Sequence, residues 1–213
     1  SFHHYQEKVC LIQMTANGRD VLIDPLAIES LDVLAPMFAD PNRIKIFHDA
    51  GYDLVCLARD FGFDFKGLFD TMLASRLLGI QRFGLAAVLK EHFDFEADKT
   101  QQRSDWARRP LLEKQIKYAR FDTHFLPRLA DALGQKLVDC DRLHWAKEDF
   151  ERLPKIAENV ASRSPANDPE GFWRIQGLKG KTPEFVGLVR ALYLIRDKLA
   201  QRIDRPPFKV FSN

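Results

Sequence analysis

The sequence has 213 residues, of which 46% are hydrophobic and 29% are charged, and its formal net charge is +2. This length and composition are enough to bury a sizeable core in one large or two small globular domains. No apolar run approaches the roughly 20 residues that span a bilayer, and the first residues lack the order of a secretory signal, so we expect a soluble cytoplasmic protein with no membrane partner.

The beginning of the chain predicts a β-hairpin. Residues 8–14 and 20–24 form short β-rich runs, and Asn17-Gly18 between them favours the left-handed conformations of a tight turn. The periodicities that follow predict a helix at 29–38, a strand at 43–48 and helices at 49–61, 70–78 and 84–93. Asp70 is the expected cap of the helix at 70–78. Strands first, then helices interleaved with single strands, indicate an α/β fold in which helices flank a mixed sheet.

The second half of the chain predicts helices after a polar, irregular segment at 94–109. Pro110 suits a first helical position, where its missing amide hydrogen costs nothing, so we expect a helix to start there. We expect that helix to continue past Pro127, with a kink, toward Leu137. Further helices are expected at 143–158 and 183–202, and the turn formers of 162–171 predict a linker.

Tyr118 and Asp122 lie four residues apart on this expected helix. Side chains at this spacing come within roughly 5–6 Å of each other on one helix face. Asp122 could then hold a metal ion while Tyr118 orients a water beside it, which is a hydrolase arrangement if a second carboxylate joins them. The same spacing is also typical of an ordinary amphipathic helix.

Basic residues gather around this pair. Between positions 99 and 128 the chain has three acids, Asp105, Glu113 and Asp122, and many more basic residues. The eight basic residues are Lys99, Arg103, Arg108, Arg109, Lys114, Lys117, Arg120 and Arg128. A positive field beside a carboxylate suits a polyanion. A solvated helix face with a charged loop is the alternative interpretation.

Three stretches together resemble ribonuclease D, a member of the DEDD superfamily of 3′-5′ exonucleases, in the subgroup whose third motif carries tyrosine. Phe47–Leu54 is similar to the second exonuclease motif and places its carboxylate at Asp53. Leu68–Gly79 and then Lys99–Leu111 resemble the approach to the third motif, and Tyr118–Asp122 matches that motif itself. The three stretches follow one another in the order of the family.

The resemblance implies a ribonuclease H-like fold and phosphodiester hydrolysis assisted by two divalent cations, Mg²⁺ or Mn²⁺. Such ions, about 3.5–4 Å apart, stabilise the attacking and leaving oxygens, and they prefer carboxylate ligands. Asp122 is then a direct metal ligand, Asp53 lies near the second ion, and Tyr118 positions the attacking water. For Asp53 the alternative is an acid stabilised by a helix dipole, and for Tyr118 a ring that only packs.

Six further residues are candidate nucleic-acid contacts. His48 lies at a strand end, where capping is the alternative, and Trp106 could stack on a base or anchor its loop in the core. The others could contact phosphates or hold the loop over the site: Lys99, Gln102, Arg103 and Arg108.

The first motif of the family, Asp-x-Glu, has no counterpart in these 213 residues. The opening residues 1–5 resemble the segment directly after that motif, and Asp20 and Asp24 flank a later strand, so neither replaces it. We therefore expect the motif to precede Ser1 in the natural protein. We also expect the 213 residues alone to bind metal weakly and to hydrolyse little.

Two C-terminal stretches, Phe172–Lys181 and Leu188–Phe208, resemble the beginning of an HRDC domain, the helical module that follows the nuclease in ribonuclease D. The expected domains are therefore an exonuclease domain at 1–158, a linker at 159–171 and a partial HRDC domain at 172–213. The expected activity is that of an exoribonuclease acting on single-stranded RNA 3′ ends, in tRNA precursors or other structured RNA. A catalytically inactive nucleic-acid-binding domain and a DNA 3′-5′ exonuclease are the alternatives.

Overall fold

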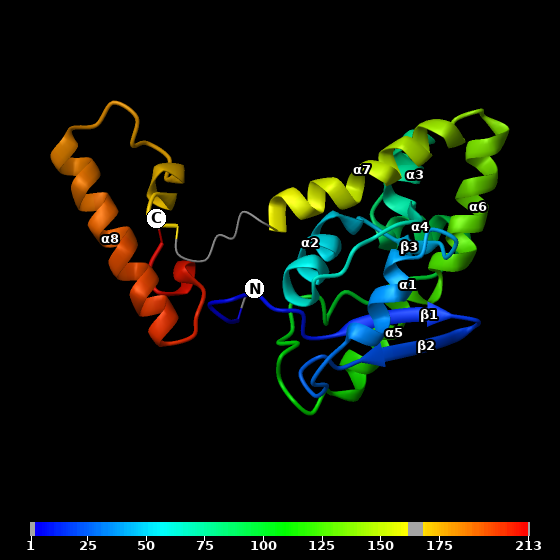
Figure 1. Ribbon diagram of the computed structural model, residues 1–213, viewed down its shortest axis with the longest axis horizontal. Coiled ribbons are helices and arrows are strands. Elements are labelled where there is room, and N and C mark those ends of the chain that lie inside the picture. The colour runs from blue at the N-terminus through cyan, green and yellow to red at the C-terminus, as the bar shows by residue number, and fades with distance from the viewer. Residues whose placement is uncertain (1–2, 162–167, 213) are drawn as a thin grey trace. The chain divides into compact units, whose positions relative to one another are not determined.

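The computed structural model describes residues 3–161 and 168–212. The chain divides into two compact units, one of Val9–Ser162 and one that joins Ser1–Lys8 to Arg163–Asn213 (Figure 1). Residues 162–167 of the linker expected at 159–171 lie outside the described residues. The sequence did not indicate that the first eight residues belong with the C-terminal segment.

The larger unit begins with the expected hairpin. Strand β1, Ile12–Ala16, pairs antiparallel with β2, Arg19–Ile23. Asn17 and Gly18 between them have φ angles of 51° and 72°, as the two central residues of a type I′ turn require. The hairpin prediction is confirmed, although β1 starts four residues later than position 8.

A second pair of strands is parallel. Strand β3, Lys45–Phe47, pairs with β4, Leu68–Asp70, in a register that sets Ile46 beside Phe69. Helix α2, Ala50–Phe61, lies in the connection between them, because parallel neighbours need a crossover. The sequence did not predict β4, since three residues that run straight into a helix show no periodicity. Among the described residues the strands form two separate two-stranded sheets, one antiparallel and one parallel.

The other helices of this unit are η1 (Asp32–Leu34), α1 (Ala35–Ala39), α3 (Thr71–Leu77), α4 (Leu85–Phe93), α5 (Glu113–His124), α6 (Leu126–Asp139) and α7 (Leu143–Ala161). Two predictions about the helices around α5 are wrong. Helix α5 starts at Glu113 and not at Pro110, since the amide of Leu112 is held by the Gln115 side chain at 2.9 Å. The expected kink at Pro127 is a break between two helices, and the proline occupies the first turn of α6.

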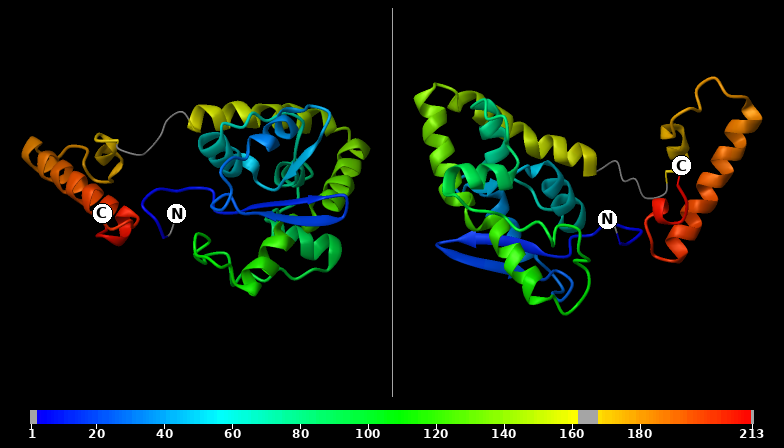
Figure 2. Two further views of the ribbon diagram at one scale, coloured as in Figure 1. Left: turned by 60° about the horizontal axis from the view of Figure 1, so that its bottom comes forward. Right: turned by 180° about the vertical axis from the view of Figure 1, so that it is seen from behind.

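Helix packing builds the core of this unit. Helix α7 packs along α2, and α6 packs against α3, as Figure 1 shows. Leu54 of α2, Leu133 of α6 and Phe150 of α7 are buried in one apolar cluster. Helix α5 packs instead on the β1–β2 hairpin, which lies beside it in both views of Figure 2. The hairpin therefore helps to position the side chains that α5 carries.

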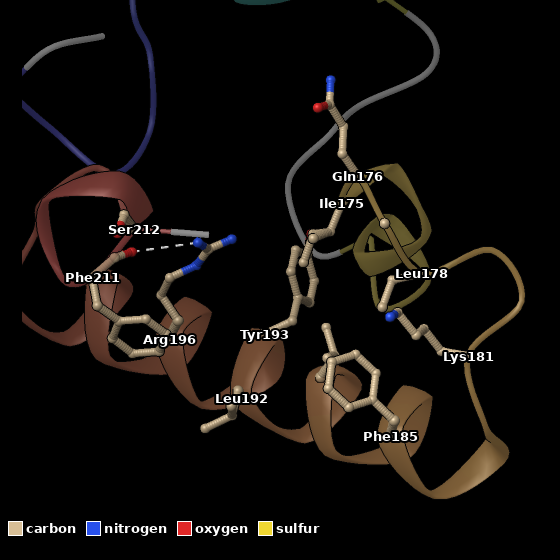
Figure 3. Close-up of a pocket in the computed structure, with 12 residues that line it drawn as sticks. Ile175, Gln176, Leu178, Lys181, Phe185, Leu192, Tyr193, Arg196, Phe211 and Ser212 are labelled. Carbon is tan, nitrogen blue, oxygen red and sulfur yellow. Dashed lines mark hydrogen bonds between the residues drawn. The ribbon is translucent and has the colours of Figure 1, made fainter.

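The smaller unit is built around α8, Pro183–Arg202, with short 3₁₀ turns at Gly171–Arg174 and Pro207–Lys209. Tyr5 joins this unit by donating its hydroxyl to Asp197 at 2.9 Å. An apolar cleft of about 280 Å³ opens between α8 and the preceding loop (Figure 3), and it contains none of the predicted site residues. In the described part of the chain, no helix has both the length and the apolar character to cross a membrane.

Candidate active site

Asp53 stands in the first turn of α2, one turn after Asp49. Part of the residue is exposed to water. Partial desolvation by the surrounding protein, together with the charges of Asp49 and Asp70, raises the pKa of Asp53 to about 6. A carboxylate that is crowded by protein and by like charges is well placed to receive a cation.

Asp70 holds the start of α2 in place. Its carboxylate is 1% exposed and accepts hydrogen bonds from the amides of Ala50 at 2.7 Å and Asp49 at 3.3 Å. It also caps α3 through the amides of Met72 and Leu73. The predicted cap on α3 is therefore confirmed. The second half of its role was missed, because 20 residues separate Ala50 from Asp70.

The backbone at Asp49 is unusual, with a φ of 64° in the left-handed region. Residues other than glycine rarely adopt this conformation, and it costs of order 1 kcal/mol. The hydrogen bond from the Asp49 amide to Asp70 helps to hold it. This turn ends β3 and immediately starts α2, so that Asp53 projects at the end of the parallel strand pair.

Tyr118 and Asp122 lie on one face of α5, as their spacing predicts. Desolvation and the charge of Asp53 raise the pKa of the half-buried Asp122 to about 6. Burial and the charge of Asp122 raise the pKa of Tyr118, so its phenol stays protonated at neutral pH. The structure thus brings Asp53, Tyr118 and Asp122 together from two helices. Because repulsion is mutual, the two carboxylates are harder to ionise together than either would be alone.

Trp106 reaches this site from the irregular loop before α5. Its ring packs against that of Tyr118, with centroids 5.9 Å apart. The buried Gln115 of α5 holds the same loop, donating to the Ser104 hydroxyl at 3.0 Å and to the Asp105 carbonyl at 3.3 Å. The half-buried Trp106 ring is placed so that it could anchor its loop or stack on a base, the two roles that the sequence leaves open.

The other candidate contacts differ in their surroundings. Four of them are exposed on the loop or its approach: Lys99, Gln102, Arg103 and Arg108. His48 is half-buried, and its Nδ1 lies 2.9 Å from the Thr71 hydroxyl. That hydroxyl donates to the Phe47 carbonyl, so we assign the proton to His48 Nδ1. Desolvation lowers the pKa of His48, which keeps the ring neutral at pH 7.

Arg109 ties the loop to the hairpin. Its guanidinium donates to both oxygens of Asp24, at 2.6 Å each, and to the carbonyls of Trp106 at 2.8 Å and Cys10 at 2.7 Å. These hydrogen bonds from Arg109 are the largest cause of the lowered pKa of Asp24. No local pattern predicts this ion pair, since its partners are 85 residues apart in the sequence.

Asp20 ties α5 to the hairpin. Only 5% of its side chain is exposed, and it accepts hydrogen bonds from Thr15 at 2.9 Å, His124 at 3.1 Å and Arg120 at 3.2 Å. Desolvation raises the pKa of Asp20, but these hydrogen bonds outweigh it, and the pKa lies below its usual value. Asp20 and Asp24 are thus both engaged in ion pairs, away from the role of a metal ligand.

A divalent cation fits the chemistry of Asp53 and Asp122. Both are hard oxygen ligands, and a cation between them would relieve the repulsion that raises the pKa of Asp122. They supply two ligands, however, where an octahedral ion takes six. Within residues 3–161 and 168–212, no group of three or more His, Cys, Asp or Glu side chains is arranged to hold a metal.

Comparison with known proteins gives one family, described as 3′-5′ exonuclease, which matches residues 1–138. The chain is 36% identical to the exosome complex exonuclease RRP6 of Saccharomyces cerevisiae over its whole length, which covers 30% of that protein. It is 30% identical to a ribonuclease D of Desulfotalea psychrophila, with 95% of the chain aligned to 54% of the relative.

A solved structure has the same fold. The catalytic core of RRP6 from Trypanosoma brucei superposes with a TM-score of 0.82 at 29% identity, covering 99% of this chain and 58% of the other. The chain therefore spans between about a third and somewhat more than half of these proteins.

Proposed function

This chain belongs to the 3′-5′ exonuclease family, and on that premise we propose that its larger unit hydrolyses phosphodiester bonds at RNA 3′ ends with the help of divalent cations. Its relatives named ribonuclease D and exosome exonuclease support RNA as the substrate. Asp53 and Asp122 are the proposed metal ligands, and Tyr118 is the proposed water-positioning residue.

One observation carries the proposal. Asp53 and Asp122 come from different helices, yet they are close enough for the charge of Asp53 to raise the pKa of Asp122 to about 6. An unneutralised pair of carboxylates is costly in a fold that has no use for it. A site that receives cations explains why the pair persists.

The side chains of the chain have distinct tasks in this proposal. Asp53 and Asp122 are mostly ionised at pH 7 and can ligate. Tyr118 keeps its proton, because its pKa is raised, and can donate a hydrogen bond to the attacking water or to a phosphate oxygen. When bound, divalent cations supply positive charge to the attacking and leaving oxygens. The exposed Lys99, Arg103 and Arg108 side chains would attract the phosphates of the strand.

The decisive experiment uses the product of the complete gene beside the 213-residue chain. A 5′-labelled single-stranded RNA is incubated with Mg²⁺, Mn²⁺ or EDTA, and a DNA of equal sequence runs in parallel. We expect stepwise shortening from the 3′ end that EDTA stops and that Asp53→Asn and Asp122→Asn abolish. Undiminished digestion by Asp122→Asn would remove this site from the proposal.

A second function has its own supporting observation. Among the described residues, no group of three or more His, Cys, Asp or Glu side chains is arranged to hold a metal, which favours a domain that binds nucleic acid without cutting it. The same experiment separates the two. A complete gene product that binds RNA tightly but leaves its 3′ end intact with either metal would establish the binding function instead.

We further propose the domain division given by the sequence, with an exonuclease domain at 1–158 and an HRDC-like module at 172–213. Helix α8 and its short 3₁₀ neighbours agree with a helical module there. A tRNA precursor as substrate, two ions per site and a cytoplasmic location are proposals of the same kind. Trimming assays on tRNA precursors and metal titrations of the complete protein would test them.

A further inference from the structure

Two carboxylates of the hairpin stand out because the proposed chemistry does not use them. Asp20 lies near the start of β2, and Asp24 directly follows that strand. Along a strand, positions four apart project from the same face. Each carboxylate holds a different part of the site, and each does so through a cation that is far away in the sequence.

The Asp20 contacts act on the helix that carries Tyr118 and Asp122. Arg120 and His124 both point to Asp20, and they alternate along α5 with the two proposed catalytic side chains. Positions two apart lie about 200° apart around a helix. The face of α5 that contacts the hairpin is therefore opposite the face that carries Tyr118 and Asp122. A hydrogen bond between Thr15 and Thr123, with hydroxyl oxygens 2.8 Å apart, strengthens the same junction.

The Asp24 contacts act on the loop that carries Trp106. Arg109 donates two hydrogen bonds to the Asp24 carboxylate and two more to the carbonyls of Trp106 and Cys10. Bidentate pairs of this kind are strong and strongly orienting. The Trp106 ring is thereby held where it meets Tyr118.

We propose that β2 and the residue that follows it form a two-point clamp, in which Asp20 and Asp24 are separate positioning residues for the two parts of the site. Asp20 sets the orientation of α5 and thus of Tyr118 and Asp122. Asp24, through Arg109, sets the loop and thus Trp106. The proposal rests on the proposed function, because it assigns the first part to the chemical step and the second to holding the RNA strand.

The test compares Asp20→Asn and Asp24→Asn, which keep shape and remove charge. Asp131→Asn, at an exposed position on α6, is the matched control. Tyrosine labelled with ¹³C reports the ionisation of Tyr118 by NMR, and 5-fluorotryptophan reports Trp106, with its ¹⁹F signal assigned by Trp106→Phe. RNA affinity without metal, and kcat and KM of the complete gene product, are measured on the same proteins.

We expect a division of effects between the two variants. Asp20→Asn should move the ionisation of Tyr118 toward its ordinary value and lower kcat about tenfold, with RNA affinity within about twofold of wild type. Asp24→Asn should shift and narrow the Trp106 signal and weaken RNA binding about tenfold, with kcat nearly unchanged. The control should change none of these.

Unchanged Tyr118 and Trp106 signals in both variants would overturn the clamp, even if both proteins melted earlier, because mere structural support would lower stability alone. Identical effects of the two variants on kcat and affinity would overturn the division of roles. If an Asn variant fails to fold, the hydrogen-bond partner of that aspartate is substituted instead. Arg120→Gln then tests the α5 contact, and Arg109→Lys tests the loop contact. If the wild-type protein neither cuts nor binds RNA, the proposed function fails, while the two NMR signals still decide the clamp.

Discussion

The indole ring of Trp106 packs against the phenol ring of Tyr118, with the two planes inclined at 40°. One ring belongs to an irregular loop and the other to α5. Aromatic pairs of this kind contribute about 0.5–1.5 kcal/mol beyond the area they bury. The contact restrains the phenol and leaves its hydroxyl as the group that can act.

Tyr118→Phe keeps this ring contact and removes only the hydroxyl. We expect the rate of 3′-end digestion by the complete gene product to fall about 100-fold, because a positioned hydrogen-bond donor is lost. RNA affinity should stay within about twofold, as measured by fluorescence anisotropy. Tyr193→Phe, in the smaller unit, is the control. A parallel loss of affinity and rate would instead give the hydroxyl a role in binding.

Asp122→Asn should make the 213-residue chain more stable at neutral pH. The pKa of Asp122 is about 6 in the folded protein against 3.8 for the unperturbed group, so the folded state holds this proton more tightly. The free energy of unfolding then falls as pH rises from about 4 to about 6 and stays low above it. Asp122→Asn should therefore raise the free energy of unfolding by about 1 kcal/mol at pH 7.5, allowing for solvent access, and change it little at pH 4. Urea unfolding at both pH values checks this, with Asp131→Asn as the control, and a gain of equal size at pH 4 would contradict the origin in charge.

Metal affinity should rise with pH, whereas the free energy of unfolding falls with it. Protons compete with a cation for Asp53 and Asp122, whose pKa values are both raised to about 6. Lowering the pH from 7.5 to 5.5 should therefore weaken Mn²⁺ binding by about tenfold. Electron paramagnetic resonance of free Mn²⁺ measures this directly. Asp122→Asn should bind more weakly at every pH and show a shallower dependence, and a flat profile for the wild type would place the ion elsewhere.

The exposed arginines of the loop should contribute to RNA binding through charge alone. Single-strand RNA affinity falls with salt, and the logarithm of the affinity is linear in the logarithm of the salt concentration. Changing Arg103 and Arg108 together to Gln should reduce the magnitude of this slope by about 1.4. The control pair is Lys147→Gln with Lys155→Gln on α7, both exposed. An unchanged slope would assign the two arginines to the architecture of the loop.

Asp70→Ala should be the most damaging of these substitutions to stability. Four backbone amides donate to this buried carboxylate, two from the start of α2 and two from the start of α3. Removing their common acceptor should cost about 3 kcal/mol in the free energy of unfolding. Asp70→Asn, which keeps one acceptor oxygen, should recover part of the loss in chemical denaturation. Equal stability of the wild type and Asp70→Ala would show that water replaces the carboxylate.

Local chemistry explains which parts of the fold were predictable. Asn17-Gly18 specifies its own turn, and Asp70 caps the helix that follows it, so both could be predicted from neighbouring residues. Helix α8 also has its predicted bounds, from Pro183 to Arg202. Strand β4 could not be predicted, because three residues carry no usable period and their partner strand is more than 20 residues away.

The site shows the same division. Tyr118 and Asp122 could be paired from their spacing on one helix, and Asp53 was found only through a resemblance that covers its whole motif. The contacts of Asp20 and Asp24 with Arg109, Arg120 and His124 span 85 to 104 residues and leave no local pattern. In the sequence they only flank an expected strand, and the folded chain reveals which residues they hold.

The alternation of roles along α5 limits how its sequence can change in length. One residue inserted between Tyr118 and Asp122 would rotate everything after it by about 100°. Asp122 would then leave the face of Tyr118, and His124 would leave Asp20. Related proteins should therefore vary in the identity of the residues along this helix while keeping its register, and insertions should gather before Glu113 or after His124, where α5 ends.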